Sequence, residues 1–252
     1  MNAPLSPISV LPSGNHPAAA ELRRFVAEID ALSNDHGIDA TERQQRLHDL
    51  RTALEDGDSE LRRRLDAHDI PARPVDHLIQ ARLRQTDGLR IATWGELLAH
   101  GGYAAAPLGR ILLHWNGNRD TAAARPLEAL CLALFTLERV LLSKQDYVEH
   151  DRIFLPQAYF RDAAIGVERL ASASAQGQIR AALDRALDGV DQLLLESAAF
   201  RCADGSLRRH LARTLCATRR LARRARQGDP FDRPVELTGW DRFFCGIRAW
   251  WR

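Results

Sequence analysis

The sequence predicts an all-α protein that folds as a single helical bundle. Apolar residues recur at three- and four-residue spacing between clusters of proline and glycine, as they do along one face of a helix. Alternation with a period of two residues is missing, and β-branched residues are sparse where strands would need them. The 252 residues, 45% of them apolar, suffice for one large core.

The gaps between these clusters place the helices in order. The proline-containing start, 1–17, is expected to be a flexible tail, and 18–252 to form one helical domain. The first helix, 18–33, is followed by the stop signal His36-Gly37. Further helices are expected at 40–54, 58–68, 74–88, 94–115, 124–148, 160–172, 176–198, 205–226 and 240–251.

Two predicted helices in the middle of the chain could contribute to a cavity. In 94–115, the pair Gly101-Gly102 could kink the helix or open space for a pocket. The helix at 124–148 is apolar on nearly every side over its first half, which places it at the centre of the bundle. Its polar end forms either the wall of a deep pocket or a helix end emerging into solvent.

The last two predicted helices are expected to lie on the outside of the bundle. The 205–226 helix is rich in arginine and has Leu211, Leu215 and Leu221 on its buried face. A solvated outer helix is favoured over an RNA-binding or anionic-membrane surface, because 35 basic residues nearly balance 33 acidic ones. The aromatic 240–251 helix either caps the bundle or contacts a membrane interface.

Composition and motifs exclude several function classes. The net charge of +2 gives no general argument for nucleic acid. The four cysteines (Cys131, Cys202, Cys216, Cys245) lie far apart and are expected to be reduced and mostly buried. The first residues lack the features of a signal peptide, which predicts a cytoplasmic protein, with peripheral contact at the inner membrane left open.

Four collinear stretches resemble the squalene/phytoene synthase family, and within it the bacterial hydroxysqualene synthase branch. They are FVAEIDALSNDHGIDATERQQRLHDLRTALE (25–55), TWGELLAHGGYAAAPLGRILLHW (93–115), HDRIFLP (150–156) and DPFDRPVELTGWDRFFCGIRAWWR (229–252). The resemblance implies an isoprenoid-synthase-like bundle with a central cavity, in which two aspartate-rich helices face each other. In that family the two helices hold Mg²⁺ ions that bind a prenyl diphosphate, and hard cations on carboxylates stabilise such a leaving group.

The first aspartate-rich motif is reduced in this chain. It maps onto Asp30, Asn34 and Asp35, and Asp30 and Asn34 keep the spacing that puts two ligands on one helix face. Asn34 offers a neutral carbonyl ligand, so the carboxylate count has fallen. An exposed acidic helix end is the alternative interpretation.

The second motif departs further. Counting back from Leu155-Pro156, the expected aspartates fall on Ser143 and Tyr147, with Lys144 between them. A register moved by three residues would instead bring Asp146 and His150 to the same face, with Glu149 adjacent. The resemblance thus gives a candidate metal site of Asp30, Asn34, Asp146, Glu149 and His150, with Asp30, Asn34, Asp35 and Asp146 as the candidate catalytic residues.

Three arginines match family positions that could contact diphosphate oxygens. They are Arg90, Arg110 and Arg152. Arginine binds phosphate in a bidentate manner without a metal, although each of these residues could equally form a structural ion pair.

The sequence therefore favours a diverged family member that binds an isoprenoid diphosphate but has impaired or lost head-to-head condensation, and that could partner a homologous synthase subunit. The rival hypothesis is an active prenyl diphosphate transferase that uses Mg²⁺ at the shifted site. A lipid carrier at a membrane surface is a third hypothesis.

Overall fold

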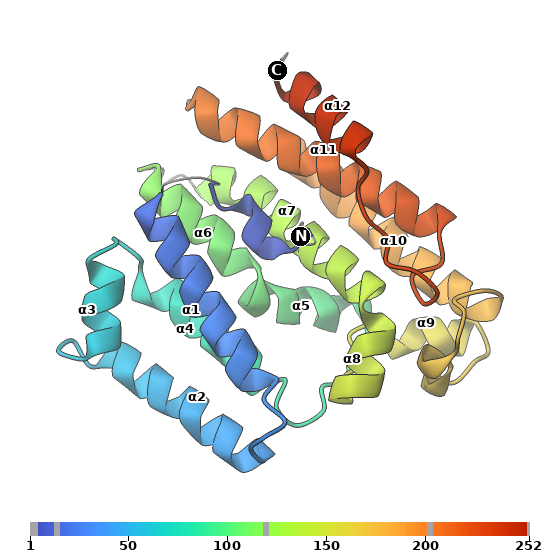
Figure 1. Ribbon diagram of the computed structural model, residues 1–252, viewed down its shortest axis with the longest axis horizontal. Coiled ribbons are helices and arrows are strands. Elements are labelled where there is room, and N and C mark those ends of the chain that lie inside the picture. The colour runs from blue at the N-terminus through green and yellow to red at the C-terminus, as the bar shows by residue number, and fades with distance from the viewer. Residues whose placement is uncertain (1–4, 13–15, 118–120, 201–203, 251–252) are drawn as a thin grey trace.

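Helices form where the apolar spacing predicts them, and polar residues cap several of their starts. The computed structural model describes residues 5–12, 16–117, 121–200 and 204–250 (Figure 1). The α-helices are α1 (Pro17–Ser33), α2 (Ala40–Glu55), α3 (Glu60–Asp66), α4 (Ala72–Leu83), α5 (Trp94–Ala104), α6 (Ala106–Trp115), α7 (Thr121–Leu141), α8 (Ser143–His150), α9 (Gln157–Asp162), α10 (Gln178–Ser197), α11 (Gly205–Gln227) and α12 (Gly239–Trp250). The side chains of Asp39, Ser59, Thr93 and Asp204 accept backbone N–H bonds at the starts of α2, α3, α5 and α11.

The prediction of an all-α fold is confirmed. In the described part of the chain, β-structure is limited to one isolated parallel bridge between Arg90 and Ile153. This bridge ties the segment before α5 to the segment after α8. Among the described helices, none is both long enough and apolar enough to cross a membrane.

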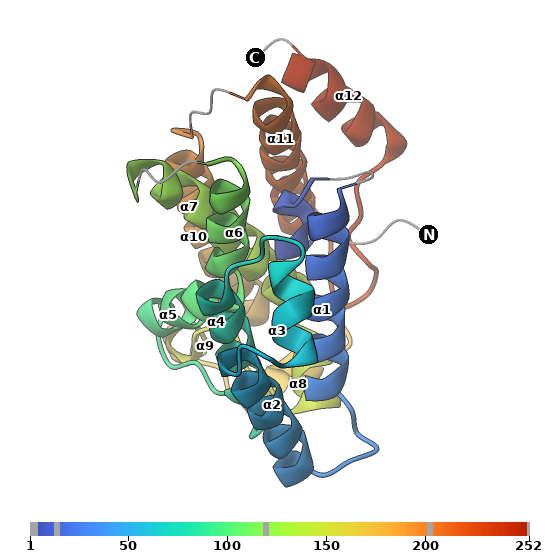
Figure 2. The same ribbon diagram turned by 90° about the vertical axis from the view of Figure 1, so that its left-hand side faces the viewer.

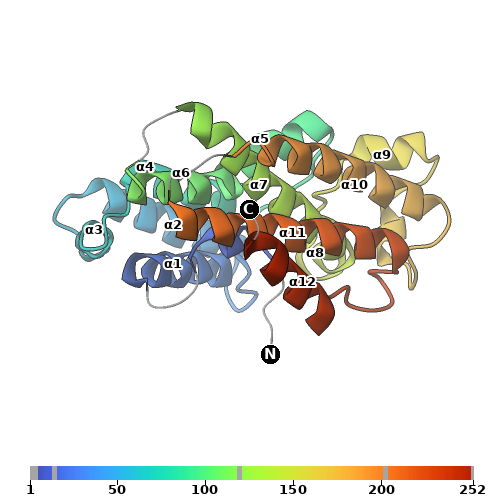
Figure 3. The ribbon, with the colours of Figure 1, turned by 90° about the horizontal axis from the view of Figure 1, so that it is seen from above.

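Helix α7 lies at the centre, as its apolar sequence predicts. It packs against α10 and α11 on one side and against α5 and α6 on the other (Figures 1 and 2). Cys131 and Leu134 of α7 are completely buried. Helices α11 and α12 lie side by side on the outside of the bundle (Figure 3).

Two helices that the sequence predicts to be continuous are broken in the structure. The 94–115 helix divides at Ala105 into α5 and α6, because Pro107 has no N–H to continue the hydrogen-bond ladder and its ring would clash with the preceding turn. The 124–148 helix divides at Leu142 into α7 and α8. In a third region, 160–172, α9 ends early and a short 3₁₀ helix, η2 (Val167–Ala171), follows.

The expected flexible tail is wrong for residues 5–12. Residues Pro7–Val10 form a 3₁₀ helix, η1, that packs against α6, α7 and α11. Val10 and Leu11 are almost completely buried. Apolar burial therefore makes this segment part of the core, and two carbonyl oxygens, of Leu11 and Pro12, accept bonds from Arg23 of α1.

The two neighbouring glycines of α5 provide a matched test of this packing. A Cβ on Gly101 would lie 2.7 Å from Leu132 and 3.2 Å from Phe135, whereas a Cβ on Gly102 would meet no atom within 4 Å. We expect Gly102→Ala to stabilise the protein by about 0.5–1 kcal/mol through helix propensity. We expect Gly101→Ala to lose about 1–3 kcal/mol through overpacking against α7. Urea denaturation measures both, and equal stabilisation by the two variants would contradict the close α5–α7 contact.

Candidate functional site

A polar pocket lies where α1, the end of α4, α7 and α8 meet. It has a volume of about 430 Å³, and η1 covers part of it. Ala104, Leu108 and Phe135 give it apolar walls. Its polar lining residues are Ser6, Arg23, Asp30, Asn34, Arg82, Gln85, Glu138, Arg139, Gln145, Asp146, His150 and Arg152.

Arginine side chains neutralise the carboxylates of this pocket. Arg82 of α4 forms an ion pair with Asp30 of α1. Arg139 of α7 donates two hydrogen bonds to the Asp146 carboxylate, at 2.8 and 3.1 Å, and forms an ion pair with Glu138 at 2.9 Å. Guanidinium groups thus hold the acids that would otherwise be free to bind a divalent cation.

Arg152 joins three segments that are distant in the sequence. It donates to the Asn34 side chain at 2.5 Å, to the Ser33 carbonyl at 2.8 Å and to the Gln85 carbonyl at 2.8 Å. Burial lowers the pKa of Arg152 to about 10, so the group still carries its charge at neutral pH. The three bonds fix the end of α1 and the end of α4 against the segment after α8.

The surroundings shift the pKa values of two further groups. Burial raises the pKa of Asp146 to about 6, and this effect exceeds the opposing attraction of Arg139. Burial lowers the pKa of His100 to about 3, and the nearby charges of Arg82, Arg84, Arg139 and Arg152 act in the same direction. His100 lies behind the pocket wall, where its Nε2 atom is 3.0 Å from the side-chain nitrogen of Gln85.

The structure brings together most of the residues predicted on the two motif helices. Asp30, Asn34, Asp146 and His150 line the same pocket, as the shifted register predicts. Ser143 and Tyr147 are not among the lining residues, and the Ser143 hydroxyl instead donates to the Val140 carbonyl at 2.9 Å.

Lys144 also turns away from the pocket. Its ammonium group lies 3.4 Å from the Phe231 carbonyl, so it does not stand between the two motif helices. The ammonium group is 5.9 Å from the centre of the Phe231 ring. Lys144 therefore adds no charge to the pocket lining.

Two predicted acids, Asp35 and Glu149, lie outside the pocket. The Asp35 side chain accepts the Gly37 N–H, and the Glu149 side chain accepts a hydrogen bond from Gln145. Both acids are exposed.

The two remaining arginines form structural ion pairs. Arg90 pairs with Asp151, and Arg110 pairs with Glu128 at 2.6 Å. Neither lines the pocket, so of the three predicted diphosphate arginines only Arg152 faces it.

Sequence reasoning missed Arg82, Gln85 and Glu138. Arg82 follows Val75, Leu78 and Ile79 on the buried face of α4, and only 9% of its surface is exposed. A charged residue in register with a buried apolar face is the signal that could have identified it.

The donor set does not fit a cluster of Mg²⁺ ions. Two of the pocket acids would have to leave Arg82 and Arg139 before they could bind a cation, and the arginines would then repel it. His36 and His150 stack with a ring separation of 5.2 Å, and nitrogen is a poor ligand for Mg²⁺. Within the described residues, no group of three or more His, Cys, Asp or Glu side chains could hold a metal ion.

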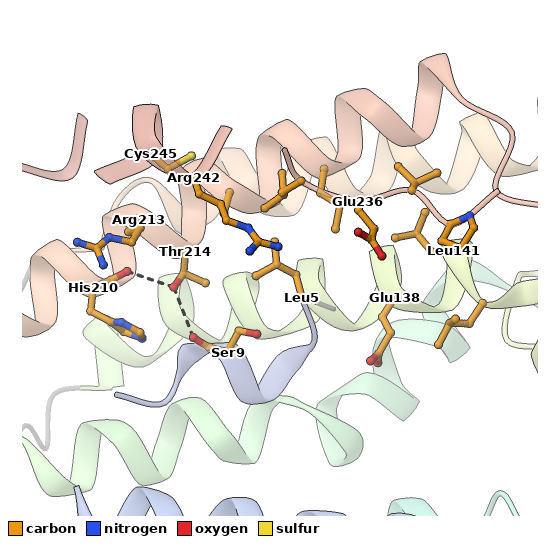
Figure 4. A pocket seen from close by; sticks show the side chains of 16 residues that line it. Leu5, Ser9, Glu138, Leu141, His210, Arg213, Thr214, Glu236, Arg242 and Cys245 are labelled. Carbon is orange, nitrogen blue, oxygen red and sulfur yellow. Dashed lines mark hydrogen bonds between the residues drawn. The ribbon is translucent and has the colours of Figure 1, made fainter. Parts of the chain in front are cut away.

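A second, larger cavity of about 670 Å³ adjoins the polar pocket (Figure 4). Glu138 and Leu142 line both spaces, and η1 and its flanking residues contribute to both. Most of its walls are apolar. The main contributors come from the residues before η1, the end of α7, α11 and the segment before α12: Leu5, Leu141, Leu142, Ala217, Leu221, Pro234, Val235 and Leu237.

Comparisons with known proteins show the family to which the chain belongs. The sequence profile of the squalene/phytoene synthase family matches residues 6–241. The chain belongs to the squalene/phytoene synthase family. The chain is 24% identical over 237 residues to a hydroxysqualene synthase from Sinorhizobium fredii, a match that covers 90% of this chain and 80% of that protein. It is 30% identical over 110 residues to a hydroxysqualene synthase from Rhodopseudomonas palustris, over 44% of this chain and 37% of that one.

Solved structures show the same fold as this family member. The squalene synthase HpnC from Alicyclobacillus acidocaldarius has a TM-score of 0.69 and 21% identity, over 88% of this chain and 85% of that one. A dehydrosqualene synthase in complex with a ligand has a TM-score of 0.77 and 18% identity, over 96% and 88%. The expected isoprenoid-synthase-like helical bundle is therefore confirmed.

The low pKa of His100 gives a testable pH dependence. The folded protein binds the His100 proton at about pH 3, whereas the ordinary pKa is 6.5, so the stabilising contribution is complete above pH 6.5 and is lost as the pH falls. We expect His100→Gln to reduce the slope of unfolding free energy against pH by up to about 1.4 kcal/mol per pH unit below pH 6.

Urea titrations at several pH values measure this slope. Asp146 titrates in the same range with the opposite sign, because its raised pKa makes stability fall as the pH rises toward 6. The difference between His100→Gln and the parent protein is therefore the relevant quantity. Parallel pH profiles for the two proteins would show that His100 is not a buried neutral group.

Proposed function

We propose that this family member binds an isoprenoid diphosphate through arginine side chains and has lost the metal-dependent head-to-head condensation. One observation carries the proposal. The three acids that line the described polar pocket, Asp30, Glu138 and Asp146, are all ion-paired with Arg82 or Arg139. These guanidinium groups occupy the place where the family resemblance implies Mg²⁺.

The proposed ligand matches the chemistry of the two adjoining spaces. Guanidinium groups donate paired hydrogen bonds to phosphate oxygens, and Arg82, Arg139 and Arg152 all face the polar pocket. The apolar cavity next to it offers about 670 Å³ for a hydrocarbon chain, within the usual range for small-molecule sites. A ligand with an anionic head and an apolar tail would satisfy both.

Binding would exchange ion pairs within the pocket. The side chain of Asp30 is 44% exposed, so Arg82 could transfer from this carboxylate to a phosphate oxygen and leave Asp30 hydrated. Asp146 is only 5% exposed at its side chain, so Arg139 would keep its carboxylate contact and present its remaining donors. The Nε atom of Arg139 is buried and makes no hydrogen bond within the described residues.

One observation favours the rival function, an active prenyl diphosphate transferase. Asp30, Asn34, Asp146 and His150 do share one pocket, as a shifted metal site requires. If Arg82 and Arg139 moved aside, these residues would be the ligands of a metal that stabilises the diphosphate leaving group.

Calorimetry with a non-hydrolysable farnesyl thiodiphosphate separates the two functions. Because arginines supply the positive charge, we expect the affinity to change less than about threefold between Mg²⁺ and EDTA, and to fall as salt is raised. With farnesyl diphosphate itself, we expect no Mg²⁺-dependent product. Binding that requires Mg²⁺, together with a condensed product, would instead establish the transferase.

A charge-matched double variant tests the role of Arg139. In Arg139→Gln/Asp146→Asn, a neutral pair of similar size replaces the more buried ion pair. Glu138 also loses its Arg139 partner, but its side chain is 19% exposed and can stay hydrated. We expect the affinity for farnesyl thiodiphosphate in EDTA to fall by about tenfold or more, since a hydrogen bond to a charged group contributes about 1.5–3 kcal/mol.

The control is the pair on the outside of the pocket. Arg110→Gln/Glu128→Gln makes the same charge change at a pair that does not line the pocket, and we expect it to leave the affinity unchanged. Equal losses in the two double variants would remove the assignment of Arg139 to the diphosphate.

The proposed location is the cytoplasm, with contact at the inner membrane surface. The exposed face of α12 supports membrane contact, because aromatic side chains favour the interface between lipid and water. That face consists of Trp240, Phe243, Phe244 and Ile247. Association with a homologous synthase subunit also stays a prediction.

A further inference from the structure

Two buried positions one turn apart join the described part of α12 to α11. Of the side chains described in 239–247, only those of Asp241 and Cys245 are buried. Asp241 accepts from Arg220 at 2.9 Å and from Arg224 at 2.7 Å, both on α11. Cys245 contacts Cys216, which is also on α11.

The two thiol groups are in position to form a bond. The Cys216 and Cys245 sulfur atoms are 2.8 Å apart, and both residues are free thiols in the structure. A disulfide bond is about 2.05 Å long, so its formation needs a movement of less than about 1 Å. The spacing of 29 residues along the chain gave no indication of this contact, because it arises from the antiparallel packing of α11 and α12.

The environment gives the two cysteines different roles. Cys216 is half-buried and lies beside Arg220, whose side chain hydrogen-bonds to its sulfur, so a positive charge stands where a thiolate would form. Cys245 is 1% exposed, and burial raises the pKa of its thiol to about 12. Cys216 is therefore the accessible nucleophile, and Cys245 is the buried partner.

We propose that Cys216 and Cys245 form a reversible disulfide that fastens α12 to α11 and so holds one wall of the apolar cavity in place. The oxidant is a small disulfide of the glutathione class. The Cys216 thiolate attacks it, forms a mixed disulfide and releases one thiolate. Cys245 then loses its proton and attacks the Cys216 sulfur, which closes the bond and releases the second thiolate. Two protein thiols are oxidised, and one small disulfide is reduced to two thiols.

The wall that this bond would hold is a substantial part of the cavity. α12 and the segment before it contribute Pro234, Val235, Glu236, Leu237, Arg242 and Cys245 (Figure 4). In the reduced protein, the described attachment of α12 includes the ion pairs of the buried Asp241 carboxylate with Arg220 and Arg224, whose side chains are 34% and 39% exposed, but no covalent link. Oxidation adds a covalent link at the centre of the same contact.

The first test is chemical. The full chain is equilibrated with mixtures of reduced and oxidised glutathione, alkylated, digested without reduction and mapped by mass spectrometry. We expect a cross-linked peptide pair containing Cys216 and Cys245 within one chain. The control variant Cys131→Ser/Cys202→Ser leaves only this pair and should form the same cross-link; Cys131 is buried in α7, and Cys202 lies outside the described residues.

The second test measures whether the disulfide restrains the motion of α12. On oxidation, we expect amide hydrogen exchange in α12 to slow by about tenfold or more, because local opening would have to strain the disulfide. Cys216→Ala should show no such change under the same oxidant, and because this residue is half-buried, the variant spares the buried Cys245 site. A failure to form the intramolecular cross-link, or unchanged exchange in cross-linked protein, would overturn the proposal.

Discussion

The position of Arg152 is the constraint on which the polar centre of this protein depends. A buried guanidinium requires acceptors, and it finds them in Ser33, Asn34 and Gln85, at the ends of two helices that leave carbonyl groups unpaired. The same three bonds hold the end of α1 opposite α8. As a consequence Asp30 and Asp146 face one pocket, although they come from helices at opposite ends of the first 150 residues.

Guanidinium groups in place of metal ions change the chemistry that such a pocket can support. Mg²⁺ ions on a diphosphate would stabilise the charge that develops when the carbon–oxygen bond breaks. The guanidinium groups of Arg82 and Arg139 are permanent, and carboxylates already neutralise them. In the proposed function they would therefore hold a diphosphate but deliver less positive charge to a departing one. This difference is the reason for proposing binding without ionisation of the ligand.

The sequence predicts the helices and about half of the site. Apolar spacing identifies the central helix, and the family resemblance brings Asp30, Asn34, Asp146 and Arg152 into one pocket. The break at Leu142 carries no proline or glycine signal, so it was not predicted. For Arg90 and Arg110 the sequence left a diphosphate contact and a structural ion pair both open, and in the fold they pair with Asp151 and Glu128. Such pairs arise from the packing of helices, which spacing within one segment does not specify.

The route by which a ligand would enter the apolar cavity depends on how firmly each wall of the cavity is held. The η1 side is anchored by Val10 and Leu11, and full burial of each such side chain contributes about 1.5–3 kcal/mol, so displacing both would cost roughly 3–6 kcal/mol. The α12 side is held, within its described part, by the buried Asp241 and Cys245 and by the Arg220 guanidinium, which lies 5.4 Å from the centre of the Phe244 ring. Because the described part of α12 buries less apolar surface than η1, we expect its movement to cost less. The exposed aromatic face of α12 lies on this wall. In the proposed membrane contact, a hydrocarbon chain leaving the lipid would therefore meet the cavity at the wall that we expect to move most readily.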